Sequence, residues 1–404
     1  GKYALGYTCY FMPEVLLNLP GCFSVRLRAP RSASPDMATY YMSGRTCMYG
    51  RALMERALEG GFNFLDAELA TETCTVTCRF QEHMQMMPGL INNPNFFCEF
   101  TDVPFKKNDN SILHYKDQLQ AHVLDVLHEK LGVDTSDEAI RKAIEEQNEI
   151  NRVIREIGEF RKLDNPTITG FEFALCQLVA IACPHYLILP KLKETLEDLK
   201  TRKPDPKPGY RIKVVVAGSE NDDPYFIQLI EECGARVVAD RYCYGSIPGR
   251  EEIEIKEGET ALEAVARHYL QTSMCTRFME QHVMRQRKET LAGIVKEYKA
   301  DGIIIEQMKF CEYWSYERMI DTFVLRRDYG IPVCSIEKEY NNGATGWARS
   351  SFALETPEAP EGYAPSNIQI AFRGITTVPS ASIFIDKIAI ADGVDVDAAL
   401  VGIS

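Results

Sequence analysis

The sequence predicts an α/β protein with two doubly wound parallel-sheet domains and an intervening helical segment. Strand-like and helix-like stretches alternate between residues 23 and 100 and again between residues 211 and 337, and the region between them has apolar residues at helical spacing. Such alternation is the pattern of a parallel sheet covered by helices. We therefore expect an N-terminal α/β domain at 1–130, a helical segment and linker at 131–205, a second α/β domain at 206–345 and an atypical tail at 346–404.

In the N-terminal domain, short apolar runs predict strands and longer amphipathic stretches predict helices. The expected strands lie at 23–29 (FSVRLRA), 63–69 and 96–100, and the expected helices at 45–60 and 75–87. Because each strand is separated from the next by a helix-like or long connection, neighbouring strands should run parallel.

The middle of the chain has helical periodicity. Between Ile112 and Phe160, apolar residues recur at helical spacing and alternate with long charged runs, which predicts two long amphipathic helices. Residues 167–199 form a further, mostly apolar helical stretch. The proline-rich, charged run at 201–210 is typical of a linker.

The second α/β domain repeats the alternation. Strands are expected at 211–218, 236–240, 301–307 and 331–337, and helices at 224–233, 260–299 and 314–327. Asp222 or Asp223 can cap the helix that begins at Pro224. Beyond residue 346 only the runs NIQIAF and SIFIDKIAIAD are strand-like, and we assign them to neither domain.

Composition excludes some classes of function. The 404 residues carry a net charge of −13, and Lys and Arg are dispersed among acidic residues, so we expect no nucleic-acid partner. No apolar run approaches the roughly 18 residues that span a bilayer, and the first residues lack the order of a secretory signal. We therefore expect a cytoplasmic protein without a membrane partner. Thirteen cysteines, an odd number, point to metal or redox chemistry.

Several cysteines lie where open parallel sheets bind ligands, which is beyond the carboxyl ends of strands. Cys74, Cys243 and Cys311 each follow a predicted strand. Cys47 begins a predicted helix, where backbone N–H groups favour a thiolate. Cys78 comes four residues after Cys74, so the two could share one face of a helical turn.

Separated thiolates of this kind suit an iron–sulfur cluster better than zinc. Structural zinc sites usually have paired C-x2–4-C elements, whereas this chain has one C-x3-C pair. Three thiolates, from Cys47, Cys74 and Cys311, could hold a [4Fe–4S] cluster with one iron left open to a substrate oxygen. For Cys98, Cys176, Cys183 and Cys334 we expect core packing, and Cys9, Cys22 and Cys233 receive no assignment.

Several segments together resemble one protein family. They are GYTCYFMPEVLL, TETCTVTCRFQEHM, FTDVPFKK, NPTITGFEF, AGSENDDPYFIQLIEECGARVVADRYCYGS, SMCTRF and DGIIIEQMKFCEYWSYERMIDTFVLRRDYGIPVCSIEKEY. In order and spacing, over about residues 1–345, they are similar to subunits of the 2-hydroxyacyl-CoA dehydratase and benzoyl-CoA reductase family. Where members of that family usually finish with a block like GQLRTRFQAF, this chain has NNGATGWARSSFALE.

The resemblance implies a fold, a cofactor and partners. It implies flavodoxin-like domains and a [4Fe–4S] cluster on Cys47, Cys74 and Cys311. It also implies a related sister subunit or a homodimer, and an ATP-dependent [4Fe–4S] activator protein that injects one electron. A related branch carries a double-cubane [8Fe–9S] cluster, for which Cys78, Cys243 and Cys275 are candidate additional ligands.

The implied function is that of an iron–sulfur subunit of an ATP-activated radical enzyme acting on an acyl-CoA substrate. The reaction expected first is dehydration of an (R)-2-hydroxyacyl-CoA through a ketyl radical. Alternatives are a benzoyl-CoA reductase-type subunit, a double-cubane reductase of small molecules, and a non-catalytic electron-relay partner. Acid–base candidates near the predicted loops are Glu72, Glu306 and Lys309, with Glu312 and His83 nearby. A nucleotide-binding protein is disfavoured because GSENDDP is not a glycine-rich phosphate loop.

Overall fold

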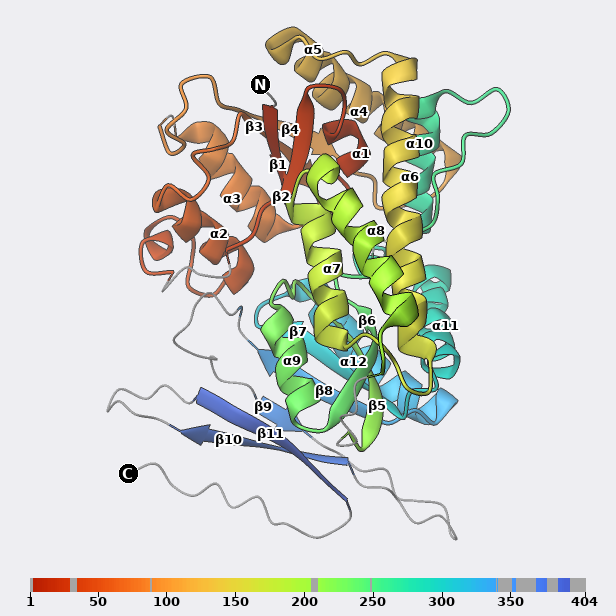
Figure 1. The fold of residues 1–404 in the computed structure, drawn as a ribbon. Coiled ribbons are helices and arrows are strands. Elements are labelled where there is room, and N and C mark those ends of the chain that lie inside the picture. Colours follow the sequence, from red (N-terminus) through yellow and green to blue (C-terminus); the bar gives the residue numbers. More distant parts are fainter. Residues whose placement is uncertain are drawn as a thin grey trace.

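The computed structural model describes residues 3–29, 35–87, 89–204, 210–247, 249–338 and 340, together with the backbone of three strands between 351 and 392. Two parallel sheets organise these residues (Figure 1). The predicted class, an α/β protein with two doubly wound domains, is confirmed.

The first sheet has the order β2–β1–β3–β4, and all of its strands are parallel. Its strands are β1 (Tyr3–Tyr7), β2 (Cys22–Arg26), β3 (Ala67–Glu72) and β4 (Phe97–Asp102). Its helices are α1 (Glu14–Leu17), the 3-10 turn η1 (Ala38–Tyr40), α2 (Met48–Leu58) and α3 (Thr75–Met86). The central strand β1 was not predicted, and β3 begins four residues later than expected.

The helical region contains α4 (Asp109–Leu119), the π-helical turn η2 (Gln120–Leu124), α5 (Asp125–Leu131), α6 (Asp137–Glu159), the 3-10 turn η3 (Phe160–Lys162), α7 (Gly170–Ala182) and α8 (His185–Thr201). Side chains cap three of these helices: Asn108 begins α4, Ser136 begins α6, and Thr169 with Glu172 forms a capping box on α7. The long helix α6 extends alongside both α/β units in Figure 1.

The second sheet repeats the topology of the first in the order β6–β5–β7–β8, with an antiparallel edge strand β9. Its strands are β5 (Ile212–Gly218), β6 (Ala235–Arg241), β7 (Gly302–Met308), β8 (Val333–Lys338) and β9 (Ser351–Ala353). The helices that follow these strands in the chain are α9 (Pro224–Glu232), α10 (Ala261–Thr272), α11 (Gln281–Glu297) and α12 (Glu312–Tyr329). As predicted, Asp223 caps α9 and Pro224 is its first residue.

Helix α10 connects the two domains, and the tail forms a separate pair of strands. Helix α10 follows the second domain's β6 in sequence but packs against α4 and α6, and its buried residues share a core with β1 and β3. The two strand-like runs of the tail form the antiparallel strands β10 (Ile368–Ile375) and β11 (Phe384–Asp392).

Candidate functional site

A cavity of about 230 Å³ lies between the two domains. Residues that follow β1, β3, β5, β6 and β7 all line it, so the carboxyl ends of both sheets face this space. In each sheet the chain order reverses once, between β1 and β3 in the first and between β5 and β7 in the second. Ligands of open α/β sheets bind at such switch points. The cavity is therefore the principal candidate for a binding site.

Six free cysteines line this cavity: Cys9, Cys47, Cys74, Cys243, Cys275 and Cys311. Five of them were predicted from the sequence as cluster ligands. The sixth predicted residue, Cys78, is not among the lining residues, and its thiol instead contacts the carbonyl oxygen of Thr71 at 3.6 Å. The structure places Cys9, which had no assignment, in the cavity.

Cys47, Cys74 and Cys311 form a first group, which we call the outer trio. Each residue immediately precedes a helix, respectively α2, α3 and α12. Backbone N–H groups and the helix dipole at these positions favour negative charge. Burial raises the pKa of the Cys47 thiol to about 12, while the N–H groups of Tyr49 and Gly50 act to lower it.

The thiols of the outer trio influence one another. After burial, which is the largest cause, the Cys74 thiol raises the pKa of Cys47, and Cys47 and Cys74 raise the pKa of Cys311. Without a bound cation all three thiols therefore stay protonated at neutral pH. A metal centre would reverse this, because thiols that coordinate a metal are deprotonated.

Cys9, Cys243 and Cys275 form a second group, the inner trio. Cys9 follows β1, Cys243 follows β6, and Cys275 lies between α10 and α11. Burial raises the pKa of Cys275 to about 11 and that of Cys243 well above its usual range, and both are raised further by the Cys9 thiol. Cys9 also raises the pKa of Cys74, so the two trios are neighbours in one cavity.

The thiols of the described residues do not form a site for a single metal ion. Among the residues that the structure describes, no three His, Cys, Asp or Glu side chains converge closely enough to hold one metal ion. The cavity is also large for an ion, since one water molecule occupies about 30 Å³ of liquid volume. Six thiols around about 230 Å³ are thus a suitable donor set for an iron–sulfur cluster.

The acid–base candidates Glu72, Glu306 and Lys309 do not line the cavity. Glu306 is fully buried on β7 and pairs with Lys338 at 2.9 Å, which is a structural ion pair within the second sheet. Glu72 is exposed at the end of β3, and Lys309 is half-buried beyond β7. Their catalytic role stays a prediction, whereas Glu312 does lie at the cavity.

Charged residues in the lining were missed by sequence reasoning. They are Arg26, Arg45, Glu220 and Arg277. Arg26 donates from Nη1 to the carbonyl oxygen of Cys243 at 2.6 Å and pairs with Glu220 at 3.5 Å. Burial raises the pKa of Glu220 to about 7. Arg277 follows Cys275 by two residues in SMCTRF, so the sequence could have identified it, whereas Arg26 reaches Cys243 only through the packing of one domain on the other.

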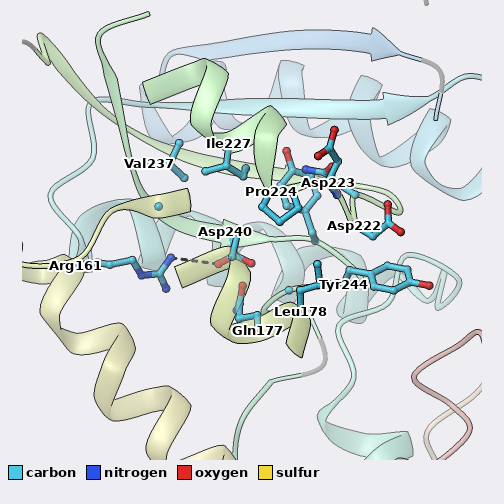
Figure 2. A pocket seen from close by; sticks show the side chains of 15 residues that line it. Arg161, Gln177, Leu178, Asp222, Asp223, Pro224, Ile227, Val237, Asp240 and Tyr244 are labelled. Carbon is cyan, nitrogen blue, oxygen red and sulfur yellow. Dashed lines mark hydrogen bonds and ion pairs between the residues drawn. The ribbon is translucent and has the colours of Figure 1, made fainter. Parts of the chain in front are cut away.

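A second, smaller cavity has a structural role. It measures about 30 Å³, room for about one water molecule, and lies between α7, α9 and β6. Figure 2 shows Arg161 directed toward Asp240 there, and the ion pair between them measures 3.3 Å. The Asp240 carboxylate also accepts hydrogen bonds from the backbone N–H and the hydroxyl of Ser246. This network fixes the loop that carries Cys243.

Regarding membranes, the helices of the described part of the chain include none long and apolar enough to cross a bilayer.

Comparisons with known proteins identify one family. Residues 9–352 match the family model of the 2-hydroxyglutaryl-CoA dehydratase D-component. The chain is 23% identical to the (R)-phenyllactyl-CoA dehydratase beta subunit of Clostridium sporogenes, over 84% of this chain and 87% of that protein. It is 23% identical to the putative dehydratase subunit YjiM of Escherichia coli, over 85% and 88%. It is 21% identical to the beta subunit of (R)-2-hydroxyglutaryl-CoA dehydratase of Acidaminococcus fermentans, over 77% and 81%. Because the family model covers most of its length, this chain belongs to the 2-hydroxyglutaryl-CoA dehydratase D-component family.

Proposed function

We propose that this chain is the iron–sulfur component of a low-potential radical enzyme and that both trios hold its cluster. The observation that carries the proposal is the convergence of six thiols from both domains on one cavity. A single [4Fe–4S] cluster needs the outer trio alone. Six thiols favour the alternative double-cubane [8Fe–9S] cluster, with Cys9 in the place that the sequence suggested for Cys78.

When bound, such a cluster would supply one-electron transfer at low potential. The chain's own residues prepare the site for it. Three helix N-termini at the outer trio direct backbone N–H groups toward the sulfur atoms, and such donors strengthen as water is excluded. Arg26 fixes the Cys243 carbonyl, so the loop after β6 keeps its thiol on the cavity.

The class of substrate rests on two observations. The names of the relatives from Clostridium and Acidaminococcus favour dehydration of an (R)-2-hydroxyacyl-CoA. The size of the cavity favours a second candidate, reduction of a small unsaturated molecule. Drug-sized ligands occupy pockets of about 300–1,000 Å³, and here about 230 Å³ has to accommodate the cluster as well.

Partners follow from the same proposal. The relatives that are named beta subunits suggest a sister subunit, and a homodimer is the alternative. A separate ATP-dependent [4Fe–4S] activator would supply the electron.

The test is metal analysis of the anaerobically purified chain. Wild type should contain the iron and sulfide of an [8Fe–9S] cluster, twice the iron of a [4Fe–4S] cluster. Cys9→Ser should lose iron, because its thiol lines the cavity, and the matched Cys78→Ser should keep it. Equal loss in both variants would contradict the six-thiol assignment. A colourless, iron-free wild type would reject the whole proposal.

A further inference from the structure

The cavity has two dissimilar ends, and this inference rests on the proposed function. Its exposed lining residues are Arg45, Thr75, Phe310 and Glu312. Each of them lies within two residues of an outer-trio cysteine, so this end is the mouth. At the other end, beside the half-buried Cys275, the lining residues Ser273, Thr276 and Arg277 are buried, and we call this the closed end.

Arg277 at the closed end is a buried cation without a carboxylate partner. Its side chain is 2% exposed and donates from Nη2 to the carbonyl oxygen of Val103 at 3.0 Å and from Nη1 to that of Pro104 at 3.1 Å. No ion pair of Arg277 occurs within the described ranges. Carbonyl dipoles compensate a guanidinium only in part, so its positive charge remains available to the cavity.

Lys107 is a second cation nearby, half-buried and outside the cavity lining, and each of the two is held by the loop that carries the other. Its Nζ donates to the carbonyl oxygens of Gln271 and Ser273, on the segment that carries Cys275. Arg277 lies over the ring of Phe105 at 4.1 Å, and Lys107 lies over the ring of Phe278 at 4.8 Å. Each loop thus provides an aromatic face for the cation of the other. Both charges are fixed beside the inner trio.

Two other cations near this end have carboxylate partners, and Arg241 is a further cation near Cys243. Arg26 pairs with Glu220 at 3.5 Å, and Arg287, which donates to the Cys275 carbonyl, pairs with Glu317 at 2.8 Å. Lys107, like Arg277, has no carboxylate partner in the part of the chain that the structure describes. The closed end therefore has one fully buried cation without a carboxylate partner, Arg277, and a half-buried second one beside it, Lys107.

Arg277 is also close to the inner trio along the chain. It follows Cys275 by two residues and lines the same cavity as Cys9, Cys243 and Cys275.

We propose that Arg277 and Lys107 are charge-compensating residues for the inner trio. They favour placement of added negative charge at Cys9, Cys243 and Cys275 and so raise the reduction potential at the closed end relative to the mouth. An electron delivered at the mouth by a low-potential one-electron donor protein would then be stabilised at the end of the cavity that Arg277 faces.

The experiment measures reduction potentials of the anaerobic, cluster-containing chain by redox titration followed by electron paramagnetic resonance. Iron and sulfide are determined on the same samples. The variants are Arg277→Gln, Arg277→Lys and Lys107→Gln. The matched control is Lys106→Gln, because Lys106 is the exposed neighbour of Lys107 and its charge is screened by water.

Arg277→Gln should make a midpoint potential of the bound cluster more negative while the iron content stays unchanged. Arg277→Lys keeps the positive charge and should therefore reverse much of this shift. Lys107→Gln should shift it in the same direction, and Lys106→Gln should leave it in place. If Arg277→Gln loses its iron, Lys107→Gln decides the question. Unchanged potentials in iron-loaded Arg277→Gln and Lys107→Gln would overturn this inference alone. An iron-free wild type would instead refute the proposed function beneath it.

Discussion

Glu68 should make the stability of the protein depend on pH between weakly acidic and alkaline conditions. This residue lies on β3 and is fully buried, and burial raises the pKa of its carboxyl group from the ordinary 4.5 to about 8. The nearby amide of Gln81 acts to lower the pKa but does not offset the loss of water. The folded protein therefore holds a proton at neutral pH that the unfolded chain releases.

The sign and size of the effect follow from linkage. With a raised folded-state pKa, the contribution of Glu68 is fully present below about pH 4.5 and is lost as the pH rises through about 8. Each pH unit between these values corresponds to about 1.36 kcal/mol, so the full loss is at most about 5 kcal/mol. This is a large share of the roughly 5–15 kcal/mol by which domains are stable. Glu68→Gln stays neutral and should not show the loss.

The assay is urea unfolding of the wild type and Glu68→Gln at pH 5, 7 and 9, followed by circular dichroism. The variant should resemble the wild type at pH 5 and exceed it in free energy of unfolding by several kcal/mol at pH 9. Glu72→Gln is the control, because Glu72 is exposed at the end of the same strand. If Glu68→Gln and the wild type lose stability in parallel up to pH 9, the buried neutral carboxyl is refuted.

Two further substitutions test the packing around the site. The Glu317 carboxylate accepts two hydrogen bonds of 2.8 Å from the buried Arg287. Glu317→Gln leaves this guanidinium without a carboxylate, so urea unfolding should show a free energy of unfolding lower by about 3–5 kcal/mol. Replacing both with Arg287→Met and Glu317→Leu should cost less, and an equal loss would contradict this reasoning. Gly50→Ala would place a Cβ 2.5 Å from Val76 Cγ1 and push α2 away from α3. Because Cys47 and Cys74 precede these two helices, the iron content should fall. Adding Val76→Ala should restore iron, and failure to do so would argue against a steric cause.

Much of the fold was predictable because hydrophobic alternation marks buried parallel strands. The exceptions have local reasons. Strand β1 has only five residues, YALGY, and its central position depends on pairing with β2 and β3. Strand β3 was placed too early because Phe64 is apolar, although it lies in a turn and is 53% exposed. The sequence shows that a residue is apolar and does not show whether a neighbour covers it.

The sequence predicted the kind of candidate site, a group of cysteines, better than it predicted which cysteines line the cavity. The rule that ligands bind beyond strand ends identified Cys74, Cys243 and Cys311, and it would have identified Cys9 if β1 had been recognised. Cys78 was included because four residues separate it from Cys74. Cys74, however, precedes α3 in an extended conformation, with φ −140° and ψ 124°, so its side chain does not follow the helical spacing. A cysteine one turn into α3 therefore faces elsewhere.

The protein's own contacts hold the two domains together around the cavity. The hydroxyls of Tyr49 and Tyr244 lie 2.8 Å apart, one from each domain, and the Tyr244 hydroxyl donates to the carbonyl oxygen of Leu27. Arg28 pairs with Asp222 at 3.0 Å, and the buried Tyr340 hydroxyl donates to the same carboxylate at 2.7 Å. Because none of these contacts involves a cavity thiol, they can align the thiols before any metal binds. Preorganised ligands of this kind bind a metal group with less reorganisation than ligands on mobile segments. A cluster would then bind at an interface between the domains that is already formed.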